Sequence, residues 1–184
     1  AGLVAVATRV EHVSALVART PELMVSGVRS GLELQPMVDS ATVLVIGPGL
    51  GTTAWSEQLL QVALASGKPM VIDADALNLL ARDQGALEIP QQGWVLTPHP
   101  GEAARLLNVS SAEVQMDRFN AARTLQRRYG GVVVLKGNGS LVASGERVGV
   151  SDYGNPGMAS GGMGDVLSGV LGALLAQGLA PADA

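Results

Sequence analysis

The sequence predicts an α/β protein with a doubly wound, mostly parallel β-sheet that is flanked by helices and carries an antiparallel hairpin at one edge. Three observations lead to this fold class. Short apolar runs rich in valine, isoleucine and leucine recur along the 184 residues, without the polar alternation of half-exposed strands. Each early run is followed by a loop and a helical pattern, as in a parallel sheet covered by helices. Two late runs are joined only by a short turn, which is typical of a hairpin.

In the first half of the chain, three apolar runs predict strands at residues 3–8, 43–46 and 70–72. A helical pattern follows each of them, at residues 11–19, at residues 54–66 and in a stretch that ends near Arg82. The last of these helices should start at Ala76, with Asp75 as its N-cap. The alternation of strand and helix therefore begins at the N-terminus.

The second half begins with a strand at Trp94–Leu96 and a short helix that ends near Leu107. Residues 111–129 predict one long amphipathic helix, because apolar side chains recur near helical spacing at Ala112, Val114, Met116, Phe119, Ala122 and Leu125. Strands are then predicted at residues 132–135, 140–144 and 146–150, the first two as a hairpin. A final apolar helix begins at Gly164 or Asp165. No linker or repeat is visible, so we expect a single domain.

Composition excludes several classes of function. The net charge of −4 gives no general attraction for nucleic acid or an anionic membrane. Aromatic residues make up only 3% of the chain, too few for a base-stacking surface, and there is no cysteine for disulfides or thiolate metal sites. No apolar run is long enough to span a bilayer, and we expect a cytoplasmic protein. Charged residues are only 15%, which favours a buried sheet or an oligomer.

Unusual loops follow the predicted strands: GPGLG after VLVI, DADALN after MVI, TPHPGE after WVL and KGNGS after VVVL. Ligands of such sheets bind beyond the carboxyl ends of the strands. These loops therefore predict a binding site at one edge of the sheet.

The glycine-rich run GNPGMASGGMGD, residues 154–165, predicts an anion site at the start of the last helix. Glycine lets the backbone approach a ligand, and a helix N-terminus offers free N–H groups and a positive dipole end. Asp165 could there remove a proton from a hydroxyl that attacks a phosphoryl group. The simpler alternative is that Asp165 is only an N-cap. Neither a Walker loop nor a G-x-G-x-x-G motif is present.

Taken together, GPGLG, IDADALN, LTPHPGEAARLL, VLKGNGSLV and NPGMASGGMGDVLSG closely resemble the ADP-dependent NAD(P)H-hydrate dehydratases of the ribokinase-like superfamily. The resemblance covers nearly the whole chain. It implies an enzyme that removes water from the hydroxylated nicotinamide ring of hydrated NADH or NADPH and restores the reduced dinucleotide. ADP is the implied co-substrate, AMP and phosphate are released, and Mg²⁺ is the implied metal.

The resemblance also assigns roles to residues. Asp165 matches the catalytic aspartate and also contacts substrate, while Gly161, Gly162 and Gly164 match the anion hole. The substrate contacts are Gly49, His99 and Asn155, and the nucleotide contacts are Lys136, Gly137, Asn138, Gly139, Ser140 and Gly164. Glu102 could approach the metal through water or close a capping box. His99 could instead bond backbone, Gly49 could serve only the turn, and the role of Asp73 is open.

Three further expectations follow from the resemblance. The chain lacks the first strand and the last helix of the family's domain, an epimerase domain can precede it, and a homo-oligomer such as a tetramer is expected. Two other functions stay open. A ribokinase-like kinase of a vitamin precursor would use the same Asp165, and a non-catalytic nucleotide-binding subunit would need the glycines but not the acid.

Overall fold

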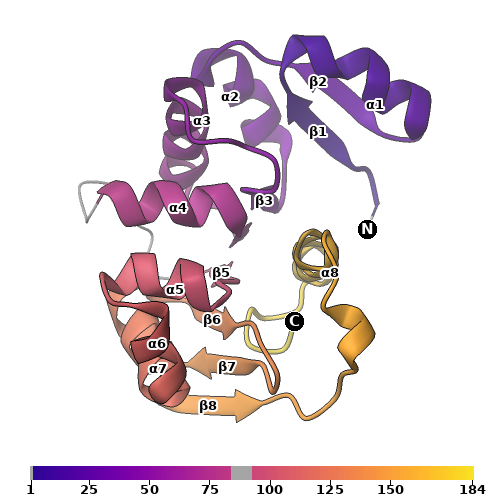
Figure 1. Ribbon diagram of the computed structural model, residues 1–184. Coiled ribbons are helices and arrows are strands. Elements are labelled where there is room, and N and C mark those ends of the chain that lie inside the picture. Colours follow the sequence, from indigo (N-terminus) through magenta and orange to yellow (C-terminus); the bar gives the residue numbers. More distant parts are fainter. Residues whose placement is uncertain (1, 84–92) are drawn as a thin grey trace.

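The computed structural model describes residues 2–83 and 93–184 (Figure 1). Its main sheet has six strands in the order β3-β4-β5-β6-β7-β8. The strands are β3 (Leu44–Ile46), β4 (Met70–Ile72), β5 (Trp94–Leu96), β6 (Val132–Leu135), β7 (Leu141–Ser144) and β8 (Arg147–Val150). The first four strands pair in parallel, and β6, β7 and β8 pair antiparallel. The predicted fold class, a mostly parallel sheet with an antiparallel edge, is confirmed.

Helices cover both faces of this sheet because successive strand residues point to opposite sides. Ile72 packs into a core formed with α3 (Ala54–Ala65), α4 (Ala74–Asp83), α5 (Pro100–Leu107) and α7 (Arg118–Tyr129). Its neighbour Val71 packs on the other face against Leu171 and Leu175 of α8 (Met163–Ala176). Figure 1 shows α8 on the opposite side of the strands from α4 and α5. Each fully buried aliphatic side chain of these layers contributes about 1.5–3 kcal/mol, so both faces stabilise the sheet.

A smaller unit precedes the main sheet. Strands β1 (Ala5–Thr8) and β2 (Met24–Gly27) pair in parallel, joined by a 3₁₀ turn (Val10–His12) and α1 (Val13–Arg19). Helix α2 (Gly31–Ser40) then leads to β3. The sequence patterns missed β2 and α2. The run MVSG is short, and Pro36 lies inside α2, where proline is generally unfavourable.

The long helix predicted over residues 111–129 is wrong. The chain forms α6 (Ser111–Met116) and α7, separated at Asp117, whose φ and ψ of −143° and 79° are not helical. The Asp117 side chain accepts a hydrogen bond from Asn120 N and so caps α7. Because of the break, Met116 is 79% exposed and Phe119 44% exposed, rather than facing the core as their spacing predicted.

None of the helices in the described part of the chain combines the length and the apolar character that crossing a lipid bilayer requires.

The close approach of Gly131 to Trp94 gives a test of this packing. An added Cβ at Gly131 would lie 1.9 Å from Trp94 Cδ1, whereas Gly145 has the same left-handed backbone (φ +56° against +59°) and open space around it. Gly145→Ala should lower the free energy of unfolding by about 1 kcal/mol through backbone strain. Gly131→Ala should lower it by about 3 kcal/mol, since the overpacking adds about 2 kcal/mol. Urea unfolding of both variants measures the difference, and equal losses would contradict the packing described.

Candidate functional site

The carboxyl ends of β3, β4, β5 and β6 lie at one edge of the sheet, as parallel strands require, and the predicted loops follow them there. Asp73 directly follows β4, and Lys136 directly follows β6. The Lys136 Nζ lies 2.8 Å from Asp73 Oδ1, although 63 residues separate the two in sequence. This ion pair shows that two of the predicted loops meet.

Asp73 also connects this edge to the last helix. Its second oxygen, Oδ2, accepts a hydrogen bond of 2.7 Å from Ser168 Oγ in α8, while Asp73 itself is only 1% exposed. Burial opposes ionisation of the carboxyl, but the hydrogen bonds from Lys136 and Ser168 and the charge of Lys136 outweigh it and hold the pKa of Asp73 below its ordinary value of 3.8. Asp73 is therefore an ionised carboxylate with both oxygens occupied.

The N-terminus of α8 lies beside this ion pair. The helix starts at Met163, and its N-cap, Gly162, has a φ of +88° and no capping side chain. The backbone N–H groups of Gly161, Gly162 and Gly164 make no hydrogen bond to any residue that the structure describes. At Gly164, the position of an added Cβ would be 3.2 Å from Lys136 Nζ. Free N–H groups, a helix dipole and an ammonium group thus converge, which is an arrangement that attracts an anion.

Asp165 is the third residue of α8, so the alternative that it is the N-cap is wrong. Its carboxylate is exposed and has no hydrogen-bond or ion-pair partner among the described residues. Ser168 lies three residues further along the helix and is the residue that bonds Asp73. Asp165 is therefore carried at the same edge as Lys136 by a fixed helix, but its own carboxylate is unpaired within the described structure.

The motif PHPGE forms the start of α5. His99 is the N-cap, and its Nδ1 accepts a hydrogen bond of 3.0 Å from Gly101 N. Glu102 closes the capping box by accepting 2.8 Å from His99 N, and its other oxygen lies 3.3 Å from His99 Nε2. The capping alternative for Glu102 and the backbone-bonding alternative for His99 are thus confirmed. Because Nδ1 accepts, the ring proton sits on Nε2, and the half-exposed ring faces its acceptor Glu102.

Glu102 belongs to the same cluster as Lys136, with 3.9 Å between Oε2 and Nζ. Among the described residues, no group of three or more histidine, aspartate or glutamate side chains is arranged to hold a metal ion. Both oxygens of Glu102 are also occupied by His99, so direct ligation of Mg²⁺ by Glu102 does not fit this geometry. A metal ion held by the phosphates of a nucleotide, with water between it and Glu102, does fit.

The GPGLG turn after β3 is held by an unexpected contact. Gly51 N donates to Asp75 Oδ2 over 2.8 Å, and Gly49 has a φ of +64° with open space around it. The prediction that Asp75 caps α4 is wrong, because α4 begins at Ala74 and includes Asp75 in its first turn. The carboxylate of Asp75 fixes the turn that exposes Gly49.

The KGNGS loop joins β6 to β7. Gly137 and Gly139 have φ values of +153° and +63°, and Ser140 Oγ bonds both the N–H and the carbonyl of Gly137. Asn155 lies in the exposed stretch before α8, where its Oδ1 accepts from Gly157 N and caps a 3₁₀ turn (Pro156–Met158). In the described structure, no hydrogen bond connects Asn155 to the other predicted site residues.

Sequence analysis missed three residues of this edge. Ser168 bonds Asp73, Thr97 is buried between β5 and β4 with its hydroxyl 3.3 Å from Ile72 O, and Arg118 contacts the KGNGS loop. Of these three residues, only Ser168 could have been found from the sequence. It lies three residues after Asp165, which was already predicted at the site, and residues three apart share a helix face.

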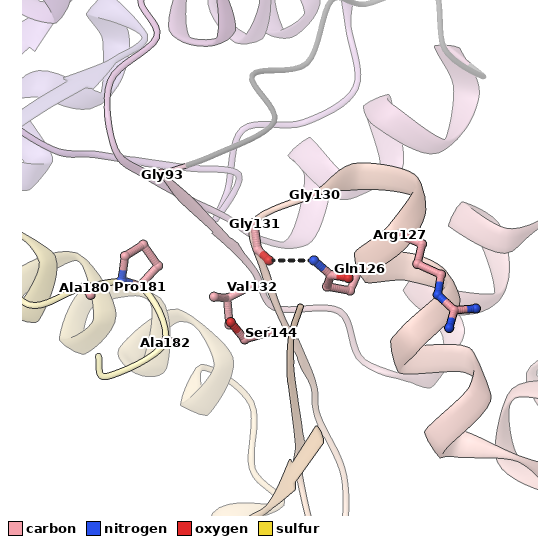
Figure 2. Close-up of a pocket in the computed structure, with 10 residues that line it drawn as sticks. All are labelled: Gly93, Gln126, Arg127, Gly130, Gly131, Val132, Ser144, Ala180, Pro181 and Ala182. Atoms are coloured by element: carbon pink, nitrogen blue, oxygen red, sulfur yellow. Dashed lines mark hydrogen bonds between the residues drawn. The ribbon is translucent and has the colours of Figure 1, made fainter. Parts of the chain in front are cut away.

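An open hollow of about 540 Å³ lies elsewhere on the molecule (Figure 2). It is lined by Gly93, which precedes β5, by Val132 at the start of β6, and by the C-terminal residues Ala180, Pro181 and Ala182. This is the amino-terminal edge of the parallel strands, opposite to Lys136. In Figure 2, the Arg127 side chain points away from Val132 and Pro181. Arg127 is the charged residue of this lining, and among the described residues no carboxylate contributes to it.

The Asp73–Lys136 pair predicts a defined pH dependence of stability. At neutral pH, Asp73→Asn should lower the free energy of unfolding by about 2 kcal/mol, because the partly buried Lys136 loses its counter-ion. The contribution of ionised Asp73 is complete above its unfolded pKa of about 3.9 and is lost as the pH falls through the lower folded pKa. The gap between wild type and Asp73→Asn should thus be constant above about pH 5 and shrink below about pH 4.

Urea unfolding over a pH series measures this gap. Asp39→Asn, which changes an exposed carboxylate on α2, is the matched control and should cost little at any pH. A gap that grew on acidification would contradict the ion pair described.

Comparisons with known proteins agree with the fold. The chain is 52% identical, over 100% of its length and 37% of the relative's, to a bifunctional NAD(P)H-hydrate repair enzyme of Coxiella burnetii. A ribokinase-like superfamily protein from Enterococcus faecalis superposes with a TM-score of 0.83 at 34% identity, covering 96% of this chain and 62% of that one.

A second solved structure is the ADP/ATP-dependent NAD(P)H-hydrate dehydratase from Bacillus subtilis, co-crystallized with ATP/Mg²⁺ and soaked with CoA. Its TM-score is 0.78 at 27% identity, covering 95% of this chain and 63% of that chain. The predicted ribokinase-like fold is thereby confirmed. The sequence family described as NAD(P)H-hydrate dehydratase matches residues 1–184, and the chain belongs to that family.

Proposed function

We propose that this chain carries the ADP-dependent dehydration of hydrated NADH and NADPH, restoring the reduced dinucleotide with release of AMP and phosphate. The observation that carries the proposal is the carboxylate of Asp165, which has no partner among the described residues and sits on a helix whose free N–H groups lie beside Lys136. Family membership supports the reaction class. The chain spans only 37% of the length of the repair enzyme it matches, so activity is proposed for the full-length gene product.

ADP binds through its phosphates in this proposal. The N–H groups of Gly161, Gly162 and Gly164 donate to phosphate oxygens, as helix N-termini commonly do. Lys136 adds a positive charge from the opposite side of the anion. The KGNGS loop, residues 136–140, supplies the remaining nucleotide contacts, with Asn138, Gly139 and Ser140 near the ribose and adenine.

Asp165 then acts as the general base. It takes the proton of the ring hydroxyl, whose oxygen attacks the β-phosphorus of ADP, and the bond from this phosphorus to the bridging oxygen breaks to release AMP. The ring now carries a phosphate ester. Its carbon–oxygen bond breaks as the neighbouring ring carbon loses a proton to solvent water, so phosphate leaves with the bonding electrons and the ring double bond returns. The N–H groups of the helix mouth stabilise charge on the transferring phosphoryl group.

The dinucleotide is held at the neighbouring loops. Glu102 orients His99, whose half-exposed ring is available to the hydrated dinucleotide. Gly49 gives the substrate open space at the GPGLG turn, and Asn155 offers an amide in the stretch before α8. Mg²⁺ would supply charge neutralisation on the nucleotide phosphates, held to Glu102 through water.

The assembly of the protein is also proposed rather than observed. We infer a cytoplasmic homo-oligomer, fused to an epimerase domain in the full-length gene product. The relative from Coxiella burnetii is named bifunctional, which supports the fusion.

Asp165→Asn tests the proposed role of the carboxylate. With hydrated NADH and ADP, turnover followed by the return of reduced-nicotinamide absorbance should fall by a factor of about 10²–10⁴, the usual contribution of a general base. The Kd of ADP, measured by calorimetry, should change by less than about threefold, because the N–H groups and Lys136 remain. Replacing ADP by ATP in the same assay tests the nucleotide preference.

Glu33→Gln is the matched control. Glu33 is the third residue of α2, as Asp165 is of α8, and its carboxylate accepts a hydrogen bond from Arg29 N. This variant should lose some stability but no turnover. If Asp165→Asn lost ADP affinity and turnover equally, the role of Asp165 would be structural, and phosphorylation of a vitamin alcohol without recovery of absorbance would indicate a kinase instead.

His99→Asn separates substrate binding from capping. Asparagine is a good N-cap, so α5 should stay intact while the ring is lost. The KM for hydrated NADH should rise about tenfold, and the Kd of ADP should stay as in wild type. Ser110→Asn, at the N-cap of α6, is the control and should change neither value. A rise in the Kd of ADP alone would place His99 at the nucleotide instead.

A further inference from the structure

Arg118, the first residue of α7, bonds the middle of the KGNGS loop and the end of the strand that precedes it. Its Nη1 donates to Asn138 O over 2.6 Å, and its Nη2 donates to Leu135 O over 3.3 Å. The first acceptor lies inside the loop and the second is the last residue of β6. A planar guanidinium has the fork of donors needed to reach two carbonyls three residues apart, which an ammonium group lacks.

The loop is shaped around this guanidinium. An added Cβ at Gly137 would lie 2.8 Å from Arg118 Nη2, and Gly137 has a φ of +153°. The Nε–H of Arg118 is buried and has no acceptor among the described residues. Leaving a buried donor unpaired is costly. Stability alone therefore does not account for this arrangement, and such local costs concentrate at functional sites.

The contacts of Arg118 set the direction of the loop's peptide groups. In a trans peptide, the C=O and the following N–H point in opposite directions, and the described chain has no cis bonds. Where Leu135 O faces Arg118, the next N–H, that of Lys136, points away and donates to Pro98 O. By the same geometry, Asn138 O faces Arg118 and Gly139 N–H points away from it. Gly139 N–H makes no hydrogen bond within the described structure.

We propose that Arg118 is a positioning residue for the nucleotide: it turns the Asn138–Gly139 peptide so that the free N–H of Gly139 faces the bound ADP. This inference rests on the proposed function, because it assigns the loop to ADP. Arg118 itself does not touch the nucleotide. It acts through the loop, and it also fixes the strand end from which Lys136 projects.

The test compares Arg118→Gln, Arg118→Lys and Arg123→Gln in the full-length gene product. Arg123 lies on the same helix, is exposed and serves as the matched control. The Kd of ADP should rise at least about tenfold in Arg118→Gln, about threefold in Arg118→Lys, which keeps the charge, and not at all in Arg123→Gln. The KM for ADP should rise in parallel, while kcat at saturating ADP should stay close to that of wild type.

Hydrogen exchange of the unliganded protein gives a readout that does not depend on ADP. Backbone amides of residues 136–140 should exchange faster in Arg118→Gln than in wild type, with α7 itself unchanged. If Arg118→Gln does not fold, Arg118→Lys decides the question by the same two measurements.

The outcomes separate the two proposals. If wild type binds ADP and both Arg118 variants bind it equally well, the positioning role is overturned and the proposed function survives. If wild type does not bind ADP, the proposed function is overturned, and the nucleotide role of Arg118 is overturned with it. Faster hydrogen exchange of residues 136–140 in Arg118→Gln would then show only that Arg118 holds the loop. A fall in kcat without a change in the KM for ADP would also overturn the positioning role.

Discussion

The ion pair between Lys136 and Asp73 is the interaction on which the site depends. A carboxylate that is only 1% exposed is stable only when its charge is compensated, and Lys136 and Ser168 do this together. The three residues come from the end of β4, the end of β6 and the second turn of α8. Satisfying one buried charge therefore fixes the mouth of α8 against the edge of the sheet, before any ligand is present.

The same edge carries two aspartates whose surroundings give them different chemistry. Both oxygens of Asp73 are occupied and the pKa of its carboxyl is held below the ordinary value, so it is a poor proton acceptor and a good anchor. Asp165 is exposed and has no partner in the described chain, so its oxygens can reach a ligand. Lys136 compensates the first aspartate and remains 21% exposed at its side chain, so it can also face a phosphate. This difference in burial makes Asp73 a structural anchor and leaves Asp165 available for the proposed reaction.

Much of this arrangement could be predicted from the sequence, because the carboxyl ends of parallel strands, and the loops that follow them, lie at the same edge of a sheet. The apolar runs of β4 and β5 are buried on both faces as expected, and parallel pairing brings the loops after β3, β4, β5 and β6 to one edge. The first predicted run behaves differently, because β1 is partly exposed and pairs with β2 outside the main sheet. What could not be predicted depended on side-chain contacts that the apolar periodicity does not encode. The break at Asp117 follows from its side chain capping α7, although the periodicity of residues 111–129 continued through it. Asp75 looked like a cap but bonds Gly51, 24 residues away. No sequence feature distinguishes Arg118 from other arginines on helix surfaces, and only the structure shows its contact with the KGNGS loop.

The anion site itself is made mainly of backbone, and this explains the glycines that first distinguished the sequence. At Gly162 the left-handed backbone starts α8 without a side chain, so no cap occupies the N–H groups that follow. Gly137 and Gly139 leave room in the same way on the facing loop. In a chain with only 15% charged residues, the proposed phosphate recognition needs few side chains, and Lys136 adds a positive charge to it. In the proposed function, binding thus rests on peptide groups whose directions are set by other residues, while proton transfer rests on one carboxylate, so the two can be changed separately.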